Sequence, residues 1–233
     1  MISFSQFLAD LTNPALAFLP KALLVAVLSA LVCGVIGTHV VLRGMAFIGD
    51  AVAHAVFPGL AIAFALQFSV IAGGALAGAV VALLIALFSQ RRRVKEDTII
   101  GIFFAAAFAL GLVVISKVQG YTASLNSFLF GSITGVSNED IIFSAVVGAV
   151  VIVAVATLHK EIVAVSVDRE TAAAMGIRVL LIDVVLYLAV TAAVVMSVRT
   201  VGNILVLALL ITPAATERPV SYTHLTLPTS DLV

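Results

Sequence analysis

The sequence predicts an all-α protein, a bundle of helices that crosses a lipid bilayer several times. Hydrophobic residues make up 63% of the 233 residues and charged residues only 10%, whereas a soluble domain averages about 25% charged residues. The mean hydropathy is +1.27, and several apolar runs approach the roughly 20 residues that one crossing requires. The formal net charge is zero, which argues against nucleic acid as a partner.

Polar interruptions define the predicted helices of the first half. Two prolines mark residues 1–20 as an interfacial lead-in, and the Arg43-Gly44 pair ends the first helix. Cys33, the only cysteine, lies in that first apolar run and is expected to be a small core residue. The expected spanning helices of this half are 21–42, 45–68 and 69–89.

Charged and polar stretches divide the second half in the same way. Residues 90–97 and 159–178 read as charged loops, and residues 117–140 read as a polar connection. The expected spanning helices are 98–116, 141–158 and 179–198. A seventh apolar run at 201–212 would measure about 18 Å as a helix, which is too short to span comfortably.

The positive-inside rule orients these helices. Four basic residues between 91 and 95 place the 90–97 loop in the cytoplasm, and Lys160, Arg169 and Arg178 place the 159–178 loop on the same side. Counting back puts Arg43 inside and the N-terminus outside. Asp183 is expected to pair with Arg178 at the inner interface, without a transport role.

Asp50 and His54 are ionisable residues inside an otherwise apolar run. Because a charge in hydrocarbon is costly, we expect these two residues to be functional. Their i,i+4 spacing places both side chains on one helix face, roughly 6 Å apart. A carboxylate and an imidazole at that distance can coordinate one divalent cation. The alternative is a proton-sharing pair that holds helices together.

Two further features have both a functional and a plain structural interpretation. Pro58 and Gly59 predict a bend or unwinding of the second helix just past His54, which suits a transport site or a simple packing kink. In the 159–178 loop, Asp168 suits an N-cap and Gly176 a C-cap around a short helix. That helix is either a docking surface for a soluble partner or an ordinary solvated connector.

Several signatures of other functions are absent from the sequence. It contains no G-x-x-x-x-G-K-[ST] phosphate loop, no H-E-x-x-H zinc-protease helix and no G-x-S-x-G nucleophile elbow. The chain is therefore not expected to be an enzyme. Of the other histidines, His39 is expected to be structural and His159 to be solvated.

Four segments match one family pattern in the same order along the chain. They are Val40–Gly59, Phe130–Gly135, Val167–Ile177 and Val201–Thr216. On these segments, over about residues 15–216, the chain resembles the ABC-3 metal permeases, the membrane subunits of bacterial ABC importers for zinc, manganese or iron. The resemblance implies an importer-type permease bundle in the bacterial plasma (inner) membrane.

The resemblance also implies partners and roles. Such a core pairs two permease subunits, here a homodimer, with ABC ATPase subunits and an extracytoplasmic metal-binding protein. Asp50 and His54 match the family's proposed metal-coordinating pair, and two copies would bring enough ligands for one ion. The metal is cargo, so no permanently bound cofactor is expected. The matching coupling-helix residues, which meet the ATPase, are Asp168, Arg169, Glu170, Ala173 and Gly176.

The end of the chain departs from the family pattern. Residues 1–216 read as the permease domain, incomplete at its C-terminus, because the family continues into further helices. Residues 217–233 lose apolar periodicity, gain two prolines and many hydroxyl side chains, and are expected to be a non-native or disordered tail. His224 is therefore not counted as a ligand.

The leading interpretation is an ATP-driven importer of divalent metal ions that works by alternating access. ATP binding on the partner would move the docking helix, and the bundle would open the Asp50/His54 site to the cytoplasm. The alternative is a self-contained proton-coupled secondary transporter or channel for divalent cations. The energy source distinguishes the two, and the docking helix favours the first.

Overall fold

The fold is seen in a computed structural model that describes residues 6, 10–45, 47–90, 94–117, 131–132 and 134–216. The arginines at 91–93, most of the 117–140 connection and the 217–233 tail lie outside these ranges, so the predictions made for them stay predictions. The elements are η1 (Pro14–Leu16), α2 (Phe18–Leu42), α3 (Ile48–Ala65), α4 (Val70–Ser89), α5 (Glu96–Lys117), α7 (Asn138–Thr157), α8 (His159–Val167), α9 (Arg169–Ala174), α10 (Val179–Val201) and α11 (Asn203–Thr216).

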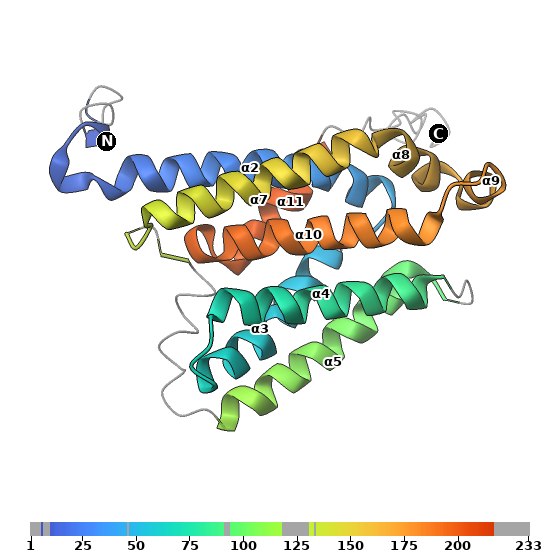
Figure 1. The fold of residues 1–233 in the computed structure, drawn as a ribbon, viewed down its shortest axis with the longest axis horizontal. Helices are drawn as coiled ribbons and strands as arrows, with labels where there is room; N and C mark the ends of the chain where they lie inside the picture. The colour runs from blue at the N-terminus through green and yellow to red at the C-terminus, as the bar shows by residue number, and fades with distance from the viewer. Residues whose placement is uncertain are drawn as a thin grey trace, which may run out of the picture.

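The long helices form two layers that meet along α10 (Figure 1). One layer contains α2, α7, α10 and α11, and the other contains α3, α4 and α5. Helix α10 packs against α2 and α7 in its own layer and against α3 and α4 across the seam. The layers are therefore joined mainly through α10. Of the residues in its apolar segment, 56% are buried.

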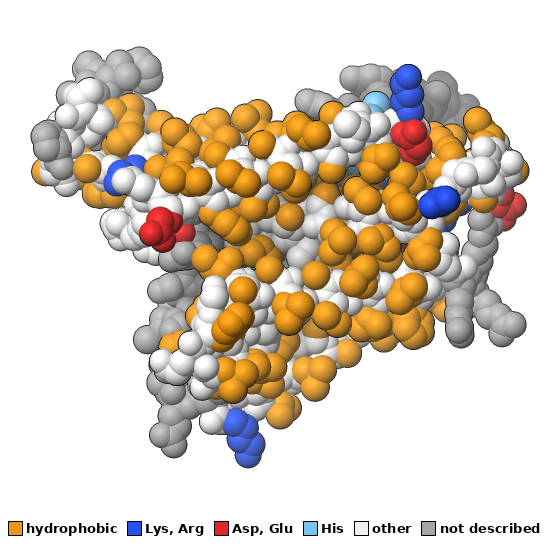
Figure 2. Space-filling model, viewed as in Figure 1, with side chains coloured by type: hydrophobic (Ala, Val, Ile, Leu, Met, Phe, Trp, Pro, Cys, Tyr) orange, Lys and Arg blue, Asp and Glu red, His pale blue; other side chains and the backbone are white. Residues whose placement is uncertain are grey.

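Six of the described helices are long and apolar enough to cross a membrane, which confirms the predicted multi-pass bundle. Helix α3 is 67% buried and α10 56%, whereas α5 and α7 are only 22% buried. Figure 2 shows hydrophobic side chains covering the middle of the helices, with charged side chains at their ends. This distribution places α3 and α10 inside the bundle and leaves the outer helices to face lipid.

One predicted helix boundary and one predicted loop were wrong. The second spanning helix begins at Ile48 rather than at Met45, because the chain turns after α2 through Gly44, whose φ is +68°. The stretch 159–167, predicted to be part of a charged loop, is the helix α8. Its charges suggested a loop, but Ile162 and Val165, three positions apart, are buried against the bundle and give the helix an inner face.

Candidate metal site and coupling helix

Helix α3 presents its two ionisable residues near its N-terminal end. Asp50 lies in the first turn, where a carboxylate is favoured by the unpaired N–H groups and the helix dipole. His54 lies one turn further on the same face. The structure therefore brings together the two residues that the sequence predicted as metal ligands.

The side chains of Asp50 and His54 are in contact. Nδ1 of His54 lies 3.3 Å from Oδ1 of Asp50 and 3.0 Å from the Asp50 backbone oxygen. An ion that holds an imidazole nitrogen and a carboxylate oxygen at about 2 Å each brings those two atoms about 3 Å apart. The observed separation fits a shared divalent cation as well as a shared proton, because Nδ1 also lies within hydrogen-bond distance of the Asp50 backbone oxygen.

The pair is only partly shielded by its own chain. The side chain of His54 is 20% exposed and that of Asp50 is 32% exposed, although α3 is the most buried of the spanning helices. Among the described residues, no group of three or more His, Cys, Asp and Glu side chains could hold a metal ion. One chain thus offers two donors here, and further ligands would come from water or another subunit.

Phenylalanine rings fix the orientation of the His54 imidazole. Its centroid lies 4.9 Å from Phe104 and 5.2 Å from Phe108, both edge-on, and 5.8 Å from Phe57. Phe104 and Phe108 belong to α5, so the imidazole is held between α3 and α5. The two contacts with α5 were not predicted, because they join residues about 50 positions apart.

Pro58 and Gly59 lie inside α3 without unwinding it. Helix α3 runs unbroken from Ile48 to Ala65. Because Pro58 has no N–H, the helix cannot offer the His54 carbonyl its usual i+4 donor. A Cβ added to Gly59 would lie 2.3 Å from the carbonyl oxygen of Gly73, so this glycine allows α3 and α4 to pack closely, as in small-residue helix crossings.

The predicted short helix between the fifth and sixth spans is α9. Asp168 caps it by accepting hydrogen bonds from the backbone N–H groups of Glu170 and Thr171. Gly176 follows the helix with φ +84°, a left-handed conformation that glycine adopts without strain. The local cap chemistry of this segment was therefore predicted correctly.

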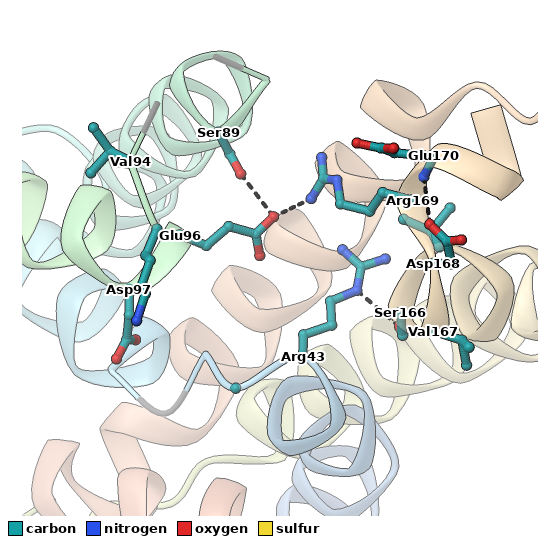
Figure 3. A pocket seen from close by; sticks show the side chains of 13 residues that line it. Arg43, Ser89, Val94, Glu96, Asp97, Ser166, Val167, Asp168, Arg169 and Glu170 are labelled. Atoms are coloured by element: carbon teal, nitrogen blue, oxygen red, sulfur yellow. Dashed lines mark hydrogen bonds and ion pairs between the residues drawn. The ribbon is translucent and has the colours of Figure 1, made fainter. Parts of the chain in front are cut away.

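The residues of α9 divide into an outer and an inner set. Asp168, Glu170, Ala173 and Gly176 are exposed at the surface. Arg169 instead turns inward, and its guanidinium donates to Glu96 (Figure 3). It also donates to Asp183. The sequence did not distinguish Arg169 from its exposed neighbours.

Two large apolar side chains flank α9 and face solvent. Val167 is 82% exposed and Met175 is 73% exposed. Both lie beyond the ends of the spanning helices, at the end of the molecule that the positive-inside rule assigns to the cytoplasm. Both side chains are therefore available to a partner that contacts α9. In the sequence, these two apolar residues stand directly before the Asp168 cap and directly after the short helix, and this placement could have indicated them.

Asp183 is the main correction to the predicted polar contacts. It is fully buried and pairs with Arg43 at 2.7 Å and with Arg169, not with Arg178. Gln90 donates a third hydrogen bond to it at 2.8 Å. The prediction was wrong because Arg178 is close to Asp183 in sequence, whereas its real partners come from other elements.

A polar cavity of about 680 Å³ lies beside these contacts, between α9 and the segment that joins α4 to α5. Arg43, Glu96 and Arg169 line it (Figure 3). The ion pair between Arg169 and Glu96 therefore connects α9 to the start of α5 beside this cavity.

The two remaining described histidines contact each other. His39 is buried in α2, and its ring lies 5.4 Å from that of His159, edge to face. His159 is exposed, as predicted. The pair joins the inner end of α2 to the start of α8.

Comparison with known proteins agrees with this architecture. Residues 15–227 match the family model described as the ABC 3 transport family. The chain is 41% identical over 200 residues to "Manganese transport system membrane protein MntC" of Halalkalibacterium halodurans, covering 86% of this chain and 68% of that protein. It is 33% identical over 199 residues to "Chelated iron transport system membrane protein YfeC" of Yersinia pestis, covering 85% and 67%.

A solved structure, "PsaBC from Streptococcus pneumoniae in complex with Fab", shares the fold. The TM-score is 0.77 at 34% identity, over 92% of this chain and 76% of that one. A second structure, an inward-facing putative metal-chelate type ABC transporter, shares only the fold, with a TM-score of 0.54 at 15% identity.

Proposed function

Because this chain belongs to the ABC 3 transport family, and is thus a membrane permease subunit of an ABC metal importer rather than an enzyme, we propose that Asp50 and His54 bind the transported ion. Family membership places ATP hydrolysis on a separate chain and decides against the self-contained secondary transporter. The observation that carries the proposal is the 3.3 Å contact between the two side chains on the most buried spanning helix.

The proposed cargo is manganese or iron, with zinc as a further candidate, and the proposed direction is into the cytoplasm. Relatives are named for manganese and chelated iron transport. One carboxylate and one imidazole per site suit all three ions, since affinity order alone does not select among them. Protonation of His54 would favour release, because the metal requires a neutral imidazole.

The proposed assembly is a homodimer. Each chain contributes two donors that remain 20% and 32% exposed, so two copies facing each other would supply four. Two carboxylates and two imidazoles around one ion complete a coordination shell that a single chain cannot. The partner set is completed by an ABC ATPase and an extracytoplasmic metal-binding protein.

The proposed docking site for the ATPase is α9 with its flanking residues. Asp168, Glu170, Ala173 and Gly176 lie on its exposed side. The cap at Asp168 keeps this short helix formed at the surface, where a partner subunit can contact it.

The test is metal accumulation in cells that lack their own high-affinity importers. This chain, co-expressed with its ATPase and metal-binding protein, is compared with Asp50→Ala, His54→Ala and a complex whose ATPase is inactive. Glu139→Gln, an exposed change at the other end of the bundle, is the matched control. The expected result is uptake of manganese or iron that all three changes abolish and the control retains.

Two outcomes would contradict the proposal. Uptake that survives loss of both Asp50 and His54, with the protein present in the membrane, would remove the site assignment. Uptake that persists with an inactive ATPase but requires a proton gradient would remove the ATP-driven mechanism.

A further inference from the structure

Asp183 binds two arginines, one 140 positions away in sequence and one 14 positions away. Arg43 donates from Nη1 to Oδ1, and Arg169 donates from Nη2 to Oδ2. The side chain of Asp183 is 0% exposed and that of Arg43 is 4% exposed. The carboxylate is thus the centre of an ionic cluster that is buried at Asp183 and Arg43 and 22% exposed at Arg169.

Each partner of Asp183 belongs to a different element. Arg169 is the first residue of α9. Arg43 caps the end of α2, seven positions before Asp50, and also donates from Nε to Ser166 of α8 at 3.0 Å. Gln90 caps the end of α4. One carboxylate therefore joins the surface helix α9 to the turn that leads into the metal-site helix α3.

Packing alone would not require this arrangement. Burying ions is costly, and well-packed apolar side chains of similar volume often give equal or greater stability. A buried ionic cluster instead fixes one geometry, because each oxygen of Asp183 accepts from a different arginine, Oδ1 from Arg43 and Oδ2 from Arg169. The cluster lies between α9 and the spanning helices α2 and α10, so a displacement of α9 would reach those helices through it.

We propose that Asp183 is a positioning residue for transport: it transmits displacement of α9 through Arg43 to the turn before α3, and so links ATP hydrolysis to movement of the Asp50/His54 site. This inference rests on the proposed function. Arg169 receives the displacement, since it is the residue of α9 that binds Asp183. Arg43 passes it on, since it ends α2 shortly before α3 begins at Ile48.

The mechanism makes a distinction that a purely structural role does not. If Asp183 only stabilised the fold, its loss would lower the amount of assembled complex, and ATP hydrolysis and transport would fall in the same proportion. If Asp183 transmits movement, the complex that assembles would hydrolyse ATP but move few ions.

The experiment compares ions transported per ATP hydrolysed by the whole importer in proteoliposomes, with manganese as the probe. Asp183→Asn and Arg169→Gln are each expected to keep ATP hydrolysis within twofold of the unmodified complex and to lower transport per ATP at least tenfold. Manganese binding to the permease is expected to stay unchanged. Glu139→Gln is the control. If Asp183→Asn does not assemble, Arg169→Gln and Arg43→Lys decide the question.

A double variant tests whether the two residues act together. Asp183→Asn combined with Arg169→Gln is expected to be no worse than either single change, because both remove one link. Multiplied losses in the double variant, or an unchanged ratio in the single variants, would overturn the inference. The failure of the proposed function is distinct, since the unmodified complex would then show no ATP-dependent uptake at all.

Discussion

Gly59 of α3 and Gly73 of α4 bring two helix backbones into direct contact. A Cβ built on Gly59 would lie 2.3 Å from the carbonyl oxygen of Gly73, and one built on Gly73 would lie 2.6 Å from the carbonyl oxygen of Gly59. Such distances leave no room for a side chain on either residue. The contact lies about one turn and a half beyond His54, so it fixes the position of α3 just past the Asp50/His54 pair.

Gly59→Ala is therefore expected to destabilise the protein. Overpacking a close contact costs about 1–3 kcal/mol, which exceeds the gain from replacing a helical glycine, about 0.5–1 kcal/mol. Thermal unfolding in detergent measures the effect. Gly101→Ala is the control, because a Cβ there meets nothing within 4 Å, and it is expected to be neutral or slightly stabilising. Equal melting temperatures for the two variants would contradict the close crossing.

His54→Asp is expected to shift the metal preference of uptake. Carboxylate ligands suit manganese, whereas imidazole also suits zinc, so zinc should compete less well against manganese in the variant. The measurement is the zinc concentration that halves manganese uptake, which we expect to rise. His159→Gln, which changes an exposed histidine, controls for zinc bound elsewhere. Unchanged inhibition in His54→Asp would exclude His54 from the site.

Asp168→Ala is expected to loosen α9. The carboxylate accepts two backbone N–H bonds at the start of this short helix, and loss of such a cap costs about 1 kcal/mol. Hydrogen exchange of the α9 amides measures the loss. Asp168→Asn keeps an accepting oxygen and should retain protection. Faster exchange in both variants would assign the effect to charge rather than to capping.

Val167→Ser and Met175→Ser are expected to weaken ATPase binding. Burial of a Val or Met side chain is worth about 1.5–3 kcal/mol, so each change should reduce affinity about tenfold or more. Binding of the isolated ATPase subunit to the purified permease measures this. Leu66→Ser, at the other end of the bundle and equally 73% exposed, should have no effect. A similar loss in Leu66→Ser would indicate a general fault in the protein.

Local sequence chemistry predicted the elements and the contact between Asp50 and His54. The spanning helices follow from run length, the α9 cap from Asp168, and the Asp50–His54 contact from i,i+4 spacing, all of which depend on neighbours within a few positions. Charge density was a poorer guide to loops. It led to the prediction of a loop at 159–167, where Ile162 and Val165 form the buried face of α8.

Contacts between distant segments could not be predicted in this way. Arg43 and Asp183 are 140 positions apart, and no periodicity or motif in one sequence pairs them. The nearby Arg178 was a reasonable partner for Asp183 on sequence distance alone. Likewise, the rings of Phe104 and Phe108 reach His54 only because α5 packs along α3.

The cluster around Asp183 also has an electrical consequence. Arg43, Arg169, Asp183 and Glu96 together carry two positive and two negative charges. A neutral group moves through the membrane field without electrical work, whereas one net charge crossing it gains or loses about 2.3 kcal/mol per 100 mV. Displacement of these four groups together therefore moves no net charge through the membrane field.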